Sequence, residues 1–313
     1  MRILSIMTII LQEALRGAFY APFYVALARD AFNAEGVDIK FTSSPHPDKT
    51  ALRVMDGTVD VSWGGPMRVM QTYQHVPNCD LVCFGEVVTR DPFLLMGREP
   101  RPNFKLADLK SVKLATVSEV PTPWLCLQHD LRLAGIDPAT ITRVTGQTMA
   151  ENMAALKAGT VDVIQVFEPF PSLILAEAAG HIWHEAAHRG HTSYTCFYAR
   201  RGTLTSRRDE LLRMVRAIDR TEKWVANATG KQIAETITPY FTDLPPAILE
   251  ALCTRYKALG IWGKNPILPK EGYNRLRDGL VSGGFVSPGA TFEQAVDNTL
   301  AQAAIDENLP PLT

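Results

Sequence analysis

Short apolar runs alternate with amphipathic stretches along residues 1–200. The apolar runs at 2–8 (RILSIMT) and 112–117 (VKLATV) predict buried strands, each followed by a loop and a helix. Second strands are predicted at 35–41 (EGVDIKF) and around 141–144. A third apolar run in each half completes a strand–helix–strand–helix–strand order, which is typical of parallel sheets with right-handed crossovers. The pattern therefore predicts an α/β protein built from two βαβ-type units.

A pentapeptide repeat supports the same division. The sequence Gly-Thr-Val-Asp-Val occurs at 57–61 and again at 159–163. Each copy follows an amphipathic helical stretch, at 48–55 and at 149–157, and each leads into an apolar strand-like run. A glycine at the end of a helix suits a left-handed C-cap. The repeat therefore predicts that the two units share one architecture.

The remainder of the chain predicts how the two units are joined. Residues 194–200 (YTCFYAR) read as another strand, and residues 206–313 are predicted to be mostly helical, without a repeat. We expect lobe 1 to comprise residues 1–92 plus 194–313, and lobe 2 to comprise residues 93–193. The chain then crosses twice between the lobes, which makes a hinge. Ligands of such sheets bind beyond the carboxyl ends of the strands, so the interlobe cleft is the expected site.

The helix after the first strand carries a resemblance to a known family. Residues 21–28 (APFYVALA) and 32–39 (FNAEGVDI) resemble the opening motif of the NMT1/THI5-like solute-binding proteins of ABC importers, which bind thiamine pyrimidines, sulfonates or nitrate. Two later motifs of the family are matched by Gly57, Asp60 and Gly64, and by 162–169 with Phe167 in place of Trp. The resemblance implies the type II periplasmic binding protein fold with two hinge crossovers. It also implies an ABC permease and ATPase as partners, a monomeric state and a periplasmic location.

Enzymes on the same fold are the alternative. A pyrimidine synthase of this fold has a dense cysteine cluster, and a desulfinase has a nucleophilic cysteine in the loop after its first strand. Here the loop predicted at 11–22 contains no cysteine, and the nearest pair, Cys79 and Cys83, lies in a predicted strand. We therefore expect no catalytic residues and no cofactor. A cytosolic pyrimidine synthase-like or desulfinase/decarboxylase-like enzyme stays open, because the apolar start at 3–11 is interpreted as a strand rather than as a secretion signal.

Charge and cysteine content exclude other classes of function. The chain has 32 basic and 33 acidic residues. The resulting formal charge of -1 offers no broad positive field for binding nucleic acid. The five cysteines are scattered and lack paired CxxC spacing, so neither a disulfide framework nor a structural zinc site is expected.

Candidate ligand contacts in lobe 1 follow its first and third strands. Tyr20 can stack on a planar ligand, although packing in the core is the alternative for an aromatic residue. Trp63 is predicted to be the main stacking wall. Gly64 and Gly65 allow a ligand to approach the backbone where Pro66 begins a helix, although a purely structural turn would also explain them.

Candidate contacts in lobe 2 occupy equivalent positions. Ser118, Glu119 and Thr122 lie between a predicted strand and its helix, where hydroxyl groups either contact a ligand or cap the helix. Glu168 follows the third strand, where its carboxylate can accept from donor groups of a ligand. The alternative is that it is a solvated surface side chain. Carboxylates opposite aromatic walls favour a planar heterocycle with N–H donors, so an aminopyrimidine-like thiamine precursor is the first expectation and an alkyl sulfonate the second.

One motif points to metal chemistry that we do not expect. His184 and His188 with Glu185 fit H-E-x-x-H, and His181 and His191 extend the histidine series. The stretch between the flanking glycines is too short for the long helix of a zinc protease. We therefore predict no metal site here.

Overall fold

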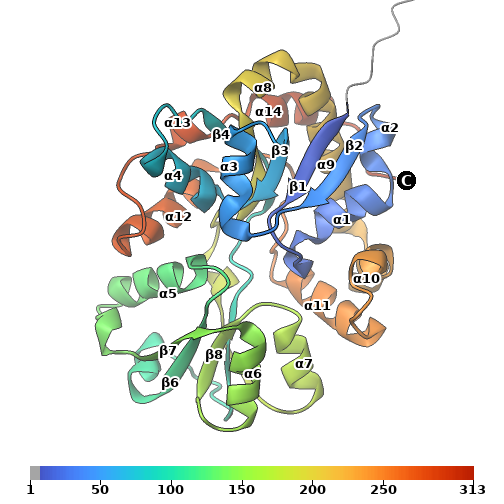
Figure 1. Cartoon of the computed structure of the whole chain (residues 1–313). Coiled ribbons are helices and arrows are strands. Elements are labelled where there is room, and N and C mark those ends of the chain that lie inside the picture. The colour runs from blue at the N-terminus through green and yellow to red at the C-terminus, as the bar shows by residue number, and fades with distance from the viewer. Residues whose placement is uncertain (1–7) are drawn as a thin grey trace, which may run out of the picture.

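The computed structural model describes residues 8–313 and has two lobes stacked one above the other (Figure 1). We call the part around the first sheet lobe 1 and the part around the second sheet lobe 2. The strand predicted at 2–8 lies outside the described residues except for Thr8, which is not in a strand. The first strand observed is β1 (Ile9–Glu13), so three residues of the predicted loop belong to a strand.

The lobe 1 sheet has the order β2-β1-β3-β10-β4. Strand β1 pairs in parallel with β2 and β3, while β10 runs antiparallel between β3 and β4. The other strands are β2 (Ile39–Ser43), β3 (Val61–Gly64), β4 (Leu81–Val88) and β10 (Thr195–Arg200). Strand β10 is placed in the sheet although it follows all of lobe 2 in the sequence, so the chain returns to complete lobe 1.

The lobe 2 sheet has the order β7-β6-β8-β5-β9 and repeats this arrangement. Strand β6 pairs in parallel with β7 and β8, and β5 runs antiparallel between β8 and β9. The bounds are β5 (Leu94–Gly97), β6 (Lys113–Val117), β7 (Thr142–Gln147), β8 (Val163–Val166) and β9 (His181–Glu185). The two copies of the pentapeptide enter β3 and β8, in different sheets, after Gly57 and Gly159 with φ of 78° and 71°. The predicted α/β fold with two hinge crossovers is confirmed.

Helices cover both sheets. Lobe 1 holds α1 (Ala21–Ala28), α2 (Ala31–Ala34), α3 (Thr50–Met55), α4 (Pro66–His75), α8 (Arg201–Ser206), α9 (Arg208–Asn227), α10 (Gly230–Ile237), α11 (Pro246–Ala258), α12 (Lys270–Ser282), α13 (Phe292–Ala295) and α14 (Thr299–Asp306). Lobe 2 holds α5 (Thr122–Leu133), α6 (Met149–Lys157) and α7 (Phe170–Ala176). Short 3-10 helices occur at Ala18–Tyr20, Pro47–Lys49, Leu106–Ser111, Pro138–Thr140, Ala186–Arg189 and Thr238–Tyr240.

The helical tail stabilises lobe 1 through its apolar faces. In α9, Leu211, Met214, Val215 and Ile218 recur at helical spacing and are fully buried. Burying each such side chain contributes roughly 1.5–3 kcal/mol. None of the helices in residues 8–313 is long and apolar enough to cross a membrane.

The tail also contacts lobe 2 on two sides. Helix α12 packs on α5 and α11 packs on α7, so two helices of lobe 1 reach across the gap between the sheets (Figure 1). These contacts frame the space between the lobes, which is where the carboxyl ends of β1, β3, β6 and β8 are directed.

Candidate functional site

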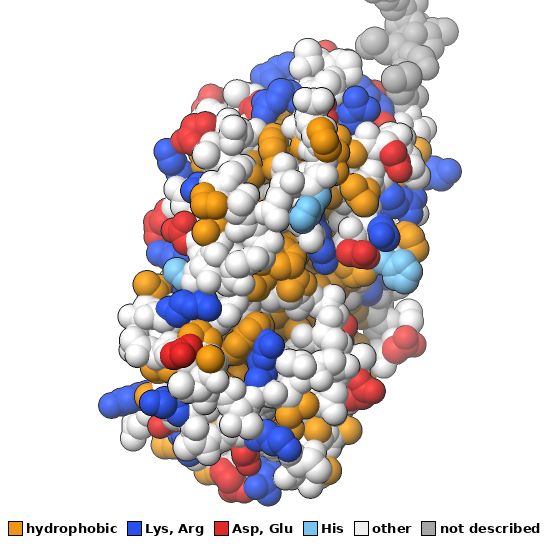
Figure 2. Space-filling model, turned by 60° about the vertical axis from the view of Figure 1, so that its left-hand side comes forward, with side chains coloured by type: hydrophobic (Ala, Val, Ile, Leu, Met, Phe, Trp, Pro, Cys, Tyr) orange, Lys and Arg blue, Asp and Glu red, His pale blue; other side chains and the backbone are white. Residues whose placement is uncertain are grey.

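A pocket of about 550 Å³, open solvent included, lies between the two lobes. Apolar side chains gather in this waist of the molecule, with charged side chains beside them (Figure 2). Its walls come from both lobes and from the two segments that connect them. The first crossover is residues 89–93, between β4 and β5, and the return crossover is residues 186–194, between β9 and β10. The lining residues are Ala14, Leu15, Phe19, Tyr20, Pro47, Gly65, Met67, Arg68, Phe93, Val120, Thr122, Phe167, Tyr194 and Leu276. We call this the interlobe pocket.

Two helices, one from each lobe, begin at the interlobe pocket. Gly65 precedes α4, and Met67 and Arg68 lie in its first turn. Thr122 is the first residue of α5. The first turn of a helix carries free N–H groups and a partial positive charge, which together favour an anion.

Arg68 is the only charged residue among the described residues that line this pocket. Its exposure is 8%, and its Nη1 donates to Gln71 Oε1 at 3.2 Å. No carboxylate of residues 8–313 forms an ion pair with it. Burial lowers the pKa of the Arg68 guanidinium, because a desolvated cation without a counter-ion is disfavoured. A bound anion would supply the missing partner.

Aromatic rings form most of the remaining wall. Phe19 of lobe 1 meets Phe167 of lobe 2 edge to face, with ring centroids 5.1 Å apart. Phe93 from the first crossover contacts the same Phe167 at 5.1 Å. Tyr20 lines the pocket as predicted from the sequence, with its ring 4.1 Å from that of Phe19. These rings would enclose a flat or apolar ligand body.

Tyr194, at the start of the return crossover, contributes a polar group to the same wall. Its hydroxyl is buried and has no hydrogen-bond partner among the described residues. Burial raises the pKa of this hydroxyl well above its ordinary value, so the group is an O–H donor at neutral pH. An O–H donor without a partner, on the same pocket as a guanidinium without an ion pair among the described residues, suits an acceptor on the ligand.

Trp63 does not reach the interlobe pocket. Its side chain is fully buried, stacked on Phe23 at 4.5 Å and on Phe41 at 5.1 Å. The alternation of β3 directs this position toward α1 rather than toward the end of the sheet. The predicted stacking wall is therefore part of the lobe 1 core.

The two glycines after Trp63 differ in role. Gly65 lines the pocket, and a Cβ there would lie 3.3 Å from the carbonyl oxygen of Tyr194. Gly64 is not among the lining residues, and a Cβ there would lie 3.2 Å from the Tyr198 hydroxyl. Close packing against β10 accounts for Gly64, while Gly65 keeps the entrance of α4 accessible.

In lobe 2, only Thr122 of the three candidates around the start of α5 lines the pocket. Glu119 instead caps a helix, because its Oε1 accepts from Met149 N at 2.8 Å at the start of α6. Ser118 is held by its backbone, whose N–H donates to Gln147 O at 3.1 Å.

Glu168 is fully buried and is directed away from the interlobe pocket. Its Oε2 accepts from Ser172 N at 3.0 Å, and its Oε1 pairs with Arg255 Nη1 at 3.2 Å. Burial raises the pKa of this carboxyl and Arg255 offsets part of the shift. The partner comes from α11, which the local sequence around Glu168 could not reveal.

Sequence reasoning missed Arg68, Phe93 and Tyr194. A signal existed for Arg68, because a cation in the first turn of a helix opposes the helix dipole and needs another reason to be there. Phe93 and Tyr194 lie on the crossovers, and only the return of the chain to lobe 1 brings them together.

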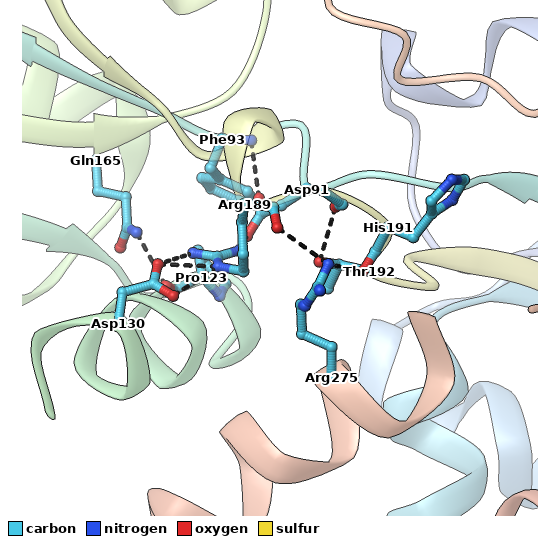
Figure 3. Close-up of polar contacts among 10 residues, drawn as sticks. Asp91, Phe93, Pro123, Asp130, Gln165, Arg189, His191, Thr192 and Arg275 are labelled. Carbon is cyan, nitrogen blue, oxygen red and sulfur yellow. Dashed lines mark hydrogen bonds and ion pairs between the residues drawn. The ribbon is translucent and has the colours of Figure 1, made fainter. Parts of the chain in front are cut away.

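A buried ion-pair group joins the crossovers beside the pocket (Figure 3). Arg189 donates to Asp130 of α5 and to Asp91 of the first crossover, with Nη1 2.7 Å from Asp91 Oδ2. Arg275 of α12 donates to the carbonyl oxygens of Arg189 at 3.0 Å and His191 at 2.8 Å. Although burial opposes its charge, Asp91 and Asp130 raise the pKa of Arg189 well above its ordinary value. The hinge is thus tied to helices of both lobes.

The histidine series forms no helix. His181 and His184 lie in β9, and His188 lies in the 3-10 turn Ala186–Arg189. His184 is largely buried and its pKa falls to about 4, because burial and the nearby Arg189 disfavour its charged form. Residues 8–313 contain no group of three or more His, Cys, Asp or Glu side chains placed to hold a metal ion.

Comparison with known proteins supports the resemblance predicted from sequence. Residues 95–238 match the NMT1-like family. A Bacillus subtilis (strain 168) protein described as "Putative binding protein YtlA" is 25% identical over 297 residues, which cover 94% of this chain and 89% of that protein. The resemblance to NMT1-like solute-binding proteins is confirmed.

Solved structures share the fold at low sequence identity. The periplasmic aliphatic sulphonate binding protein SsuA from Escherichia coli superposes with a TM-score of 0.75 at 16% identity, covering 92% of this chain and 96% of that one. The desulfurization enzyme DSZB superposes with a TM-score of 0.66 at 12% identity, covering 96% and 99%. The periplasmic binding protein fold therefore carries both binding proteins and an enzyme.

Proposed function

We propose that this protein is the extracytoplasmic solute-binding component of an ABC importer, working with a permease and an ATPase. We propose further that the interlobe pocket binds a small anion with a flat or apolar body, an organic sulfonate before others. The observation that carries the ligand class is the buried guanidinium of Arg68, which lines the pocket without an ion-pair partner among the described residues.

Three further features support an anion. The first turns of α4 and α5 reach the pocket from opposite lobes, and the Tyr194 hydroxyl has no hydrogen-bond partner within residues 8–313. The aminopyrimidine predicted from sequence depended on Glu119 and Glu168 as acceptors. Both side chains are engaged elsewhere: Glu119 accepts from the backbone N–H of Met149 at the start of α6, and Glu168 forms an ion pair with Arg255. Desolvating a guanidinium beside a neutral or cationic heterocycle would leave it uncompensated, which is costly.

Binding rather than turnover is supported by the chemistry of the lining. The described lining residues include no Cys, Ser, His, Asp or Glu, so none of the usual nucleophiles or general bases other than Thr122 and the tyrosines faces the ligand. An enzyme is the second candidate, because DSZB shares the fold. The position of the pocket between two hinged lobes suits capture by closure.

A ligand screen tests this proposal. Alkane- and arenesulfonates, aromatic carboxylates, nitrate and aminopyrimidines would be compared by thermal shift and then by calorimetry. A ligand that binds only the folded state raises the midpoint of thermal unfolding. A sulfonate present at a hundred times its Kd adds about 2.7 kcal/mol to the free energy of unfolding. Arg68→Met should weaken sulfonate binding at least about tenfold, because charge-assisted hydrogen bonds contribute about 1.5–3 kcal/mol.

Arg143→Met is the matched control. Arg143 stacks on Trp124 at 4.3 Å and lines no part of the pocket, so affinity should not change. Stabilisation by aminopyrimidines alone, unaffected by Arg68→Met, would reject the anion assignment. Formation of a product from any bound compound would reject the binding role.

A further inference from the structure

A second pocket of about 920 Å³, open solvent included, lies beside the hinge. It is formed by the end of β4, by both crossover segments and by the loop after α11. The residues that matter are Glu86, Thr89, Arg90, His191, Trp262 and Lys264. The loop is fixed along β4, since Thr89 N donates to Ile261 O and Gly263 N donates to Val87 O, both at 2.9 Å. We call it the hinge pocket.

A carboxyl oxygen without a hydrogen-bond partner lines the hinge pocket. Glu86 is 2% exposed, and its Oε1 has no hydrogen-bond partner within residues 8–313. Burial raises the pKa of this carboxyl to about 8, and the hydroxyls of Ser193 and Thr89 offset part of that shift. A buried acceptor that the protein leaves unpaired requires a donor from elsewhere.

A second buried carboxyl group lies behind the pocket. Glu222 of α9 is fully buried, and neither of its oxygens has a partner among the described residues. It lies directly behind Gly263, where a Cβ would come within 2.9 Å of Glu222 Oε1. The pKa of Glu222 is raised well above its ordinary value by burial and by Asp219 and Glu86.

Cations complete the lining. Arg90 donates from Nη1 to Leu259 O at 3.4 Å, and Lys264 is exposed. Neither forms an ion pair with a described residue. The Nδ1 of His191 is engaged with Thr89 Oγ1 at 2.8 Å. The pocket therefore presents an unpaired carboxylate oxygen together with two unpaired basic side chains.

We propose that the hinge pocket is a second ligand site, which takes a small zwitterion of the amino-acid or aminoalkyl-acid class. The ammonium group would donate to Glu86 Oε1, and the acid group would lie toward Arg90 and Lys264. A purely cationic ligand would leave both basic side chains unpaired, and a purely anionic ligand would leave Glu86 Oε1 without a donor. An ammonium group, in contrast, favours the ionised form of Glu86. This site shares no lining residue with the interlobe pocket.

Calorimetry with simple probes tests the proposal. Glycine, β-alanine and γ-aminobutyrate are the zwitterions, while n-butylamine and butyrate carry one charge each. We expect saturable binding of at least one zwitterion, and binding at least tenfold weaker for both single-charge probes. Glu86→Gln keeps the size of the side chain and should weaken zwitterion binding at least tenfold.

Lys264→Glu is the second variant, at an exposed position whose change leaves the core intact, and it should weaken binding several-fold. Arg68→Met, in the interlobe pocket, should leave zwitterion binding unchanged. The proposal is overturned if no zwitterion saturates the protein, if binding survives both Glu86→Gln and Lys264→Glu, or if Arg68→Met abolishes it.

Discussion

Glu168, fully buried in lobe 2, forms a 3.2 Å ion pair with Arg255 of α11 in lobe 1. The adjacent residue reinforces the contact, because Tyr256 Oη accepts from Glu168 N at 2.9 Å and donates to Pro92 O at 3.3 Å. The tail of the chain is therefore bonded to lobe 2 and to the first crossover at a single place. The relative placement of the two lobes therefore depends on groups that are far apart in the sequence.

Removing the cation of this pair should destabilise the protein. Arg255→Met leaves the Glu168 carboxyl buried without its partner, and we expect a loss of about 3 kcal/mol in the free energy of unfolding. Urea titration measures it. Lys231→Met is the control, because its pair with Glu235 spans 3.9 Å with both side chains 65% exposed and should contribute little. The double variant Arg255→Met/Glu168→Gln should recover part of the loss. Equal effects of the two single variants would contradict the interpretation.

Trp63→Ala should act on stability and not on the ligand. The indole is stacked between Phe23 and Phe41 in the core, so its truncation should cost about 3–5 kcal/mol. The affinity of the folded fraction for its ligand should stay within about threefold of the unmodified protein. Parallel urea titration and calorimetry decide the matter. A tenfold loss of affinity with unchanged stability would make Trp63 a ligand contact after all.

Removing the hydroxyl of Tyr194 and removing that of Tyr256 should have different effects on stability. Tyr194→Phe removes a buried hydroxyl without a hydrogen-bond partner among the described residues, so stability should stay the same or rise while affinity for the anion falls several-fold. Tyr256→Phe removes a hydroxyl with two partners and should cost about 1–2 kcal/mol in stability. Unfolding and binding would be measured on both variants. A stability loss in Tyr194→Phe equal to that in Tyr256→Phe would mean that the first hydroxyl is bonded.

Glu86 should make stability decline with rising pH. Its pKa is about 8 in the folded protein against 4.5 for an ordinary glutamate, so the folded state binds the proton more tightly. The contribution is fully present below pH 4.5 and is lost as pH rises to 8, by up to about 1.4 kcal/mol per pH unit. Urea titrations at pH 5 to 8 should show a shallower decline for Glu86→Gln, while Glu222 retains its own contribution. An identical pH profile for the variant would show that Glu86 is not the group that titrates.

Much of the fold could be predicted because its signals are local. The run at 149–157 predicted α6 (Met149–Lys157) at its exact bounds, since helical periodicity and Gly159 agree. The structure adds an N-cap at Thr148, whose side chain accepts from Glu151 N. The repeated pentapeptide placed one strand in each sheet for the same reason. The first strand was placed too early, because the apolar run 3–11 offers several positions and only pairing with β2 and β3 selects Ile9–Glu13.

The residues of the candidate site were likewise predictable only where the signal is local. The order of strands and loops along the chain by itself indicated that Tyr20, Gly65 and Thr122 follow strands of two facing lobes, and the structure places these three on the interlobe pocket. Only the tertiary structure decided that Trp63 packs against α1 and that Glu168 forms an ion pair with Arg255. It alone brought Arg68, which has no ion pair within residues 8–313, to the same pocket as Tyr194. The direction of a side chain and the identity of its partner depend on helices that are distant in the sequence, 40 residues from Phe23 to Trp63 and 87 from Glu168 to Arg255. No local pattern encodes which helix covers a given strand.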